Sequence, residues 1–222
     1  MSETIEAPPK SASGSTPLFP AEDRQDELLR RLSRLELLLV GERMDLVEGN
    51  EPTGEEGALE AGVLEAAALP LAARFEQFID GLGFPNFRGA EFTPYWSRVR
   101  NGVRNSAPPE RLWANIVPTL AVLQRFRTEL GRPVQLLSTY RSPDYNRAVG
   151  GATGSMHKEF RAIDFTVSAG NPTQWAKILR GYRGQRFRDP HRNEDFRFRG
   201  GIGIYTSSNF VHVDTRGHDV DW

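Results

Sequence analysis

Leucines at helical spacing mark the first part of the chain. Between Leu28 and Leu39 they follow one another at steps of three and four residues, with arginine and glutamate between them, which predicts an amphipathic helix over residues 21–41. The same periodicity recurs later and predicts three further helices. These are Leu64–Leu82, Pro109–Leu130 and Thr173–Tyr182.

Short apolar runs, several of them alternating with polar residues, predict strands in the C-terminal half. They are separated by loops rich in Gly, Ser, Pro and Asn. The predicted strands are Val134–Thr139, Ala162–Val167, Gly201–Tyr205 and Phe210–Thr215. Because helical segments mostly precede these strands, we expect an α+β fold with a small, mainly antiparallel sheet and flanking helices.

Composition divides the chain into four parts. Residues 1–20, rich in Ser, Pro, Glu and Ala, are expected to be a disordered tail ahead of the helix at 21–41. Residues 42–60 are acidic and contain glycine, as solvated linkers do, so a single domain is expected over residues 61–222. The Leu28–Leu39 stripe fits either self-association as a short coiled coil or packing on the chain's own domain.

Charge and residue usage exclude several classes of protein. The formal net charge of -1 provides no basic field, so nucleic acid is not an expected partner. The longest apolar stretch, around Leu35–Val40, falls well short of the ~20 residues of a membrane span. The first residues are acidic and proline-rich, so no signal peptide is visible and synthesis in the cytoplasm is expected. Without cysteine, any metal must be bound by nitrogen and oxygen.

Two segments of the C-terminal half carry candidate chemistry. In GSMHKEFRAIDFTV, His157 ends a glycine-rich loop, and strand alternation turns Asp164 away from the apolar face. In NFVHVDTRG, the same alternation places His212 and Asp214 on one face. If the two strands are neighbours, Asp164 and His212 converge.

Two histidines and one aspartate suit zinc with a fourth position left for water, which is the arrangement of catalytic sites. The remaining histidines, His191 and His218, lie in charged, irregular segments. Taken alone, an HxD pattern on an alternating strand, such as that at His212, is most often a solvent-facing pair.

The ordered motifs STYRSPDYNRAVGGATGSMH, AID, GGIGIY and FVHVDTRG resemble those of the D-alanyl-D-alanine carboxypeptidase-like zinc peptidases. This family shares its fold with hedgehog signalling domains, and the resemblance spans about residues 134–222. It implies zinc held by His157, Asp164 and His212. It also implies hydrolysis of an amide bond in peptidoglycan stem or cross-link peptides that contain D-amino acids.

The resemblance also suggests roles beside the metal. Arg141 matches an arginine that binds the substrate carbonyl or stabilises the oxyanion, and its alternative role is a salt bridge that holds the loop. Tyr140 and Ser155 are candidate substrate-binding residues. The Ser155 hydroxyl fits a turn-forming role equally well.

The chain departs from the family pattern at two places. Phe160 replaces a glycine, so the ring could reshape the cleft or force a different local backbone. Where several relatives carry a Glu or His as general base, this chain has Asn209 and Phe210. Asp214 is the substitute we favour, although it could instead orient a histidine ligand. His218 is a weaker candidate.

These observations support a zinc metallopeptidase, either a carboxypeptidase or an endopeptidase of peptidoglycan. Its expected site of action is the bacterial cell wall, and the missing export signal fits a phage-type lysis protein. The alternative is a zinc-stabilised binding module without catalysis, because the hedgehog relatives show that the fold permits it.

Overall fold

The structure is a computed structural model that describes residues 69–222. The predictions for the tail, the 21–41 helix, the linker and the domain boundary at residue 61 therefore lie outside the described residues. Within the described part, no helix combines the length and the apolar character needed to cross a membrane.

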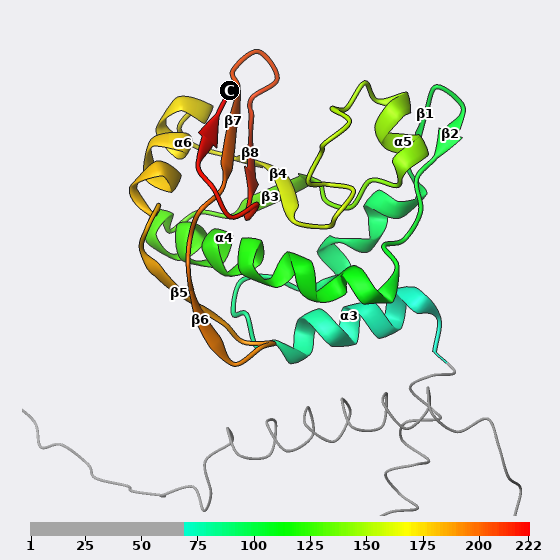
Figure 1. Ribbon diagram of the computed structural model, residues 1–222, viewed down its shortest axis with the longest axis horizontal. Coiled ribbons are helices and arrows are strands. Elements are labelled where there is room, and N and C mark those ends of the chain that lie inside the picture. The colour runs from blue at the N-terminus through cyan, green and yellow to red at the C-terminus, as the bar shows by residue number, and fades with distance from the viewer. Residues whose placement is uncertain (1–68) are drawn as a thin grey trace, which may run out of the picture. The chain divides into compact units, whose positions relative to one another are not determined.

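The centre of the fold is a five-stranded sheet (Figure 1). Its strands, in spatial order, are β3 (Val134–Ser138), β4 (Ala162–Val167), β8 (Phe210–Asp214), β7 (Gly201–Tyr205) and β9 (Val220–Asp221). Only the pairing of β7 with the short β9 is parallel. The predicted class, α+β with a mainly antiparallel sheet, is confirmed.

One face of this sheet is apolar and packs against α4 (Val117–Leu130) and α6 (Pro172–Gly181). Phe165 of β4 meets the Phe126 ring of α4 edge-on, with centroids 5.2 Å apart, and also packs near Trp175 of α6. The strand alternation that buries Phe165 turns its neighbour Asp164 to the opposite face. The apolar core therefore fixes which side of the sheet can carry polar chemistry.

The predicted helix Pro109–Leu130 is two helices. A 3-10 helix, η3 (Glu110–Ile116), precedes α4, and Pro118 lies in the first turn of α4. Proline has no N–H and clashes with the preceding turn, so an α-helix can begin at Pro118 but cannot run through it. Gly131 ends α4 with a left-handed φ of 63°.

Proline also shortens the first domain helix in the described part of the chain. We predicted Leu64–Leu82, whereas α3 spans Leu71–Gly81 and follows directly after Pro70. Phe75 of α3 is completely buried, and its ring meets those of Trp96 and Trp113 edge-on. This aromatic cluster packs α3 into the domain core.

Several short elements were not predicted. The 3-10 helices η1 (Gly89–Glu91) and η2 (Thr93–Ser97) lead into a hairpin of β1 (Val99–Arg100) and β2 (Val103–Arg104). Helix α5 (Pro143–Ala148) follows β3, and a hairpin of β5 (Arg186–Asp189) and β6 (Glu194–Arg197) follows α6. Figure 1 shows α5 beside the β1–β2 hairpin, on the other side of the sheet from α6.

Candidate metal centre

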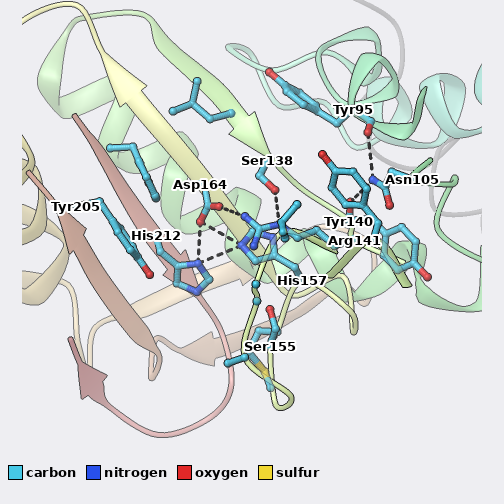
Figure 2. A pocket seen from close by; sticks show the side chains of 18 of the residues that line it. Tyr95, Asn105, Ser138, Tyr140, Arg141, Ser155, His157, Asp164, Tyr205 and His212 are labelled. Carbon is cyan, nitrogen blue, oxygen red and sulfur yellow. Dashed lines mark hydrogen bonds and ion pairs between the residues drawn. The ribbon is translucent and has the colours of Figure 1, made fainter. Parts of the chain in front are cut away.

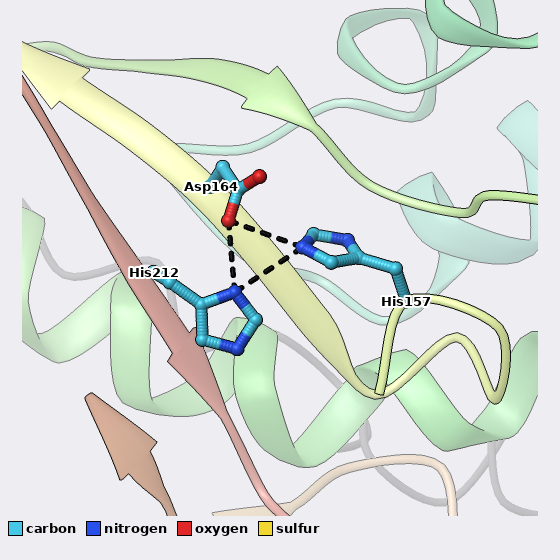
Figure 3. Close-up of side chains that lie close together, drawn as sticks. All are labelled: His157, Asp164 and His212. Carbon is cyan, nitrogen blue, oxygen red and sulfur yellow. Dashed lines mark hydrogen bonds and ion pairs between the residues drawn. The ribbon is translucent and has the colours of Figure 1, made fainter. Parts of the chain in front are cut away.

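Three predicted ligands meet on the polar face of the sheet (Figure 3). Asp164 of β4 and His212 of β8 are directly opposite in the strand register, and His157 reaches them from the preceding loop. Asp164 Oδ1 lies 3.1 Å from His157 Nε2 and 2.8 Å from His212 Nδ1, and the two nitrogens are 3.2 Å apart. All three side chains are buried, so the solvent-facing alternative for the HxD pattern is wrong.

Hydrogen bonds on the outer side of the His157 and His212 rings show which ring nitrogen carries the hydrogen. His157 Nδ1 lies 2.5 Å from the carbonyl oxygen of Thr139, and because a carbonyl only accepts, this nitrogen carries the hydrogen. His212 Nε2 likewise donates to the Asp214 carboxylate at 2.9 Å. In the neutral rings, His157 Nε2 and His212 Nδ1 are then left with lone pairs. Two nitrogen lone pairs and a carboxylate oxygen converge on one point.

Asp164 supplies the negative charge at the centre. Burial alone would raise the pKa of Asp164, but the adjacent histidines hold it well below its usual range, so the carboxylate is ionised. Burial would lower the pKa of His212, yet hydrogen bonds to Asp164 and Asp214 raise it, so without a metal His212 Nδ1 holds a proton that a bound ion would displace. Burial lowers the pKa of His157, which favours its neutral, metal-binding form.

The spacing fits a single zinc ion. Tetrahedral zinc with bonds of about 2.0–2.1 Å places its ligand atoms about 3.3 Å apart. The observed separations of 2.8–3.2 Å form a triangle slightly smaller than this. Small outward movements of the side chains would accommodate the ion, and three protein ligands leave one tetrahedral position open. The residues present therefore fit zinc.

Asp214 lies behind His212 and faces away from the other two ligands. It is completely buried, and it accepts hydrogen bonds from the Gly201 N–H at 3.0 Å and from the guanidinium of Arg216. Burial would raise its pKa, but His212 and Arg216 hold it well below the usual value. These contacts match the orienting alternative for Asp214 rather than that of a general base in the cavity.

Arg141 contacts the metal centre directly. One of its terminal nitrogens donates to Asp164 Oδ2, the oxygen that does not face the histidines, and its Nε donates to Ser138 Oγ at 2.8 Å. Its backbone N–H donates to the His157 carbonyl at 3.2 Å. Arg141 thus makes a salt bridge, as the alternative to a substrate-binding role predicted. The partner in this salt bridge is Asp164, a candidate metal ligand.

The three candidate ligands lie in a cavity of about 830 Å³ (Figure 2). Tyr140, Arg141 and Ser155 also line it, whereas Asp214 and His218 are not among the lining residues. Tyr140 is buried, and burial raises the pKa of its hydroxyl, which therefore stays protonated. Among the described residues that line the cavity, Asp164 is the only acidic one.

Phe160 does not reshape the cavity. Its ring is completely buried and packs between Phe75 and the edge of Tyr140. Its backbone φ is 52°, in the left-handed region that favours glycine, which explains why a glycine suits this position. The chain keeps the glycine-like backbone here, and the ring adds core packing against α3.

Three aromatic residues that were not predicted form one wall of the cavity. The rings of Tyr205 and Phe210 are stacked with centroids 4.2 Å apart, and Trp222 Nε1 donates to the Tyr205 hydroxyl at 2.8 Å. A side chain at Gly203 would lie 2.6 Å from Trp222 Nε1, so the glycine leaves room for the indole against β7. The GGIGIY motif was a sequence signal for this close approach.

The sequence analysis did not identify Asn105, which stabilises the backbone around Arg141 on the opposite wall of the cavity. Its buried amide donates to the carbonyls of Tyr140, at 2.8 Å, and Tyr95, at 3.1 Å, and its oxygen accepts from the Ser142 N–H. These bonds bracket Arg141 on both sides along the chain. No local sequence pattern points to this role, because Asn105 is distant from Arg141 in the sequence.

The comparisons with known proteins agree with this geometry. The sequence model of the family described as peptidase M15 matches residues 85–214, which include all three candidate ligands. The peptidoglycan L,D-endopeptidases MepK of Escherichia coli K12 and of Shigella flexneri are each 30% identical to the chain over 146 residues. The matched part is 63% of this chain and 68% of each relative.

Proposed function

Because the chain belongs to the peptidase M15 family, we propose that it is a zinc-dependent endopeptidase that cleaves an amide bond in peptidoglycan peptides. The observation that carries this proposal is that His157, Asp164 and His212 converge in one cavity. The side-chain atoms that face away from the point of convergence are already hydrogen-bonded. The names of the relatives favour endopeptidase over carboxypeptidase, and the bond we propose is one between an L and a D centre.

Zinc held by these three residues would supply a Lewis acid for the scissile carbonyl and would lower the pKa of a bound water molecule. The protein's own contribution is positioning. Thr139 and Asp214 fix the orientation of His157 and His212 through their outer ring nitrogens. Arg141 holds the second oxygen of Asp164 and brings a positive charge to the cavity, where it stabilises charge that develops on the attacked carbonyl.

One observation keeps a second candidate, a zinc-stabilised binding module. Apart from Asp164 itself, no acidic side chain of the described residues lines the cavity, so a carboxylate general base is not evident. Such a module would bind peptidoglycan peptides without cleaving them. The presence of three ligands rather than four, with Arg141 lining the same cavity, favours the enzyme.

A digestion experiment separates the two candidates. Purified peptidoglycan of several chemotypes is incubated with the zinc-loaded protein, with chelator-treated protein and with the His212→Ala variant, and released fragments are identified by mass spectrometry. We expect fragments from a single type of amide bond with the zinc-loaded protein only. Zinc-loaded protein that binds peptidoglycan but releases nothing supports the binding module.

The cell wall as the site of action, and a phage-type lysis role, remain part of this proposal. Immunoelectron microscopy of cells that contain the protein would locate it. Accumulation away from the wall throughout growth and lysis would contradict this part.

A further inference from the structure

The cavity carries more positive charge than its own acidic groups neutralise. Three arginines line it, and two are paired: Arg141 with Asp164 and Arg216 with Asp214. Among the described residues, no acidic side chain pairs with the third, Arg98. A bound zinc ion would add further positive charge. The cavity is therefore suited to a substrate that brings its own negative charge.

Arg98 is held in place although its side chain is exposed. One terminal nitrogen donates to the Leu137 carbonyl at 2.7 Å, and the guanidinium carbon lies 4.2 Å from the centre of the Tyr95 ring. The Tyr95 hydroxyl in turn donates to the Leu136 carbonyl, which fixes the ring. A guanidinium has five N–H groups, so donors remain for a ligand. The charge is positioned before any substrate arrives.

A bulge in β3 binds Arg98 next to the residue that pairs with Asp164. The register between β3 and β4 shifts between Leu136 and Ser138, and the bulged residue, Leu137, is the one whose carbonyl Arg98 binds. Ser138 is directly opposite Asp164. Strands are about 4.8 Å apart and rise about 3.4 Å per residue, so Leu137 is roughly 6 Å from the Asp164 backbone. Arg98 is thus within reach of a substrate residue near the scissile bond.

The ligand that matches this arrangement is a carboxylate. Its two oxygens can take parallel hydrogen bonds from a planar guanidinium, which an amide group of similar size cannot do with the same strength. We propose that Arg98 binds a free carboxylate of the substrate, one to three residues from the scissile bond, and selects such peptides over amidated ones. This inference rests on the proposed function and names the substrate class of that site.

The test compares two cross-linked peptidoglycan peptides that differ only in whether the carboxyl group nearest the scissile bond is free or amidated. Wild-type protein, Arg98→Ala, Arg98→Lys and Arg100→Ala are assayed on both. Arg100 is the matched control, because it is an exposed arginine only two residues further along the chain, in β1, and is not among the residues lining the cavity.

For the free carboxyl peptide, we expect Arg98→Ala to raise KM about 10-fold, with Arg98→Lys intermediate and Arg100→Ala near wild type. For the amidated peptide, wild-type KM should already be raised about 10-fold, and Arg98→Ala should change it little. Equal wild-type KM values for both peptides would overturn the proposal, as would equal effects of the two alanine variants. Melting temperatures of all variants, expected to be unchanged, exclude misfolding.

Binding measurements separate failure of this inference from failure of the proposed function. The Kd of each zinc-loaded variant for both peptides is measured by calorimetry. If the wild type cleaves neither peptide, the hydrolase proposal fails, yet a 10-fold binding preference for the free carboxyl that Arg98→Ala abolishes still supports Arg98. If cleavage occurs without that preference, the hydrolase proposal stands and the role of Arg98 is refuted.

Discussion

The two walls of the cavity position their side chains by different means. On the sheet wall, Asp164 and His212 are opposed because β4 and β8 pair in one register, which the apolar residues on the other face of both strands fix. On the loop wall, which follows β3, the Asn105 amide bonds the backbone of the residues on either side of Arg141, and His157 donates to the Thr139 carbonyl. Hydrophobic patterning thus specifies one wall, and polar contacts over long sequence distances specify the other.

The strongest way to break this comparison is to remove one ligand from each wall. His157→Ala and Asp164→Ala should both lose the zinc and all measurable hydrolysis, because three ligands leave no spare. Elemental analysis of dialysed protein gives the zinc content. If either variant keeps a full equivalent of zinc, that residue is not a ligand and the two walls do not share one centre.

Phe160 tests how far the loop wall depends on the core. Phe160→Ala should lower the free energy of unfolding by about 3–5 kcal/mol, because it removes a completely buried ring between Phe75 and Tyr140. Phe160→Gly should cost about 1 kcal/mol less, since glycine relieves the left-handed backbone. Urea denaturation measures both. If glycine is no better than alanine, the φ of 52° is not a source of strain.

Arg141 tests the catalytic share of the loop wall. Arg141→Ala should lower hydrolysis by at least ~100-fold, about 2.7 kcal/mol, as expected for loss of a group that stabilises transition-state charge. The zinc should remain bound, because Arg141 contacts Asp164 through the oxygen that does not face the histidines. Kinetics and zinc analysis of the same preparation decide this. Zinc loss that accounts for the whole defect would reduce Arg141 to holding Asp164 in place.

Asp214 tests support on the sheet wall, with the smallest expected effect. Asp214→Asn keeps the shape but weakens the acceptor of the His212 Nε2 hydrogen, so zinc affinity should fall by roughly 10- to 100-fold. Titration against a competing chelator measures the affinity. Activity at saturating zinc should be close to wild type. A loss of more than 100-fold in kcat with unchanged affinity would instead indicate proton transfer by Asp214.

The sheet wall was predictable because its signals are local. The four strands that form most of the sheet were located to within one residue, and alternation turned Asp164 and His212 away from the core. The sequence alone could not decide whether Asp214 acts as a general base or orients His212. Alternation puts Asp214 and His212 on one face but does not show which nitrogen of the ring the carboxylate reaches.

Some missed elements did leave signals in the sequence. Ser142 caps α5, and Pro143 occupies its first turn, a common helix start that we read only as part of a motif. Strand β5 alternates Arg and Phe before the PHRN turn, which is a hairpin pattern. By contrast, the two-residue strands β1, β2 and β9 are too short for periodicity, and Asn105 and Arg98 act through backbone carbonyls far along the chain.

The most direct test of the central claim is a crystal structure of the zinc-loaded protein with anomalous data at the zinc edge. We expect one zinc ion bound by His157 Nε2, Asp164 Oδ1 and His212 Nδ1 at about 2.0–2.2 Å, with Thr139 and Asp214 on the outer ring nitrogens. Zinc at another place, or coordination by the opposite ring nitrogens, would contradict the account.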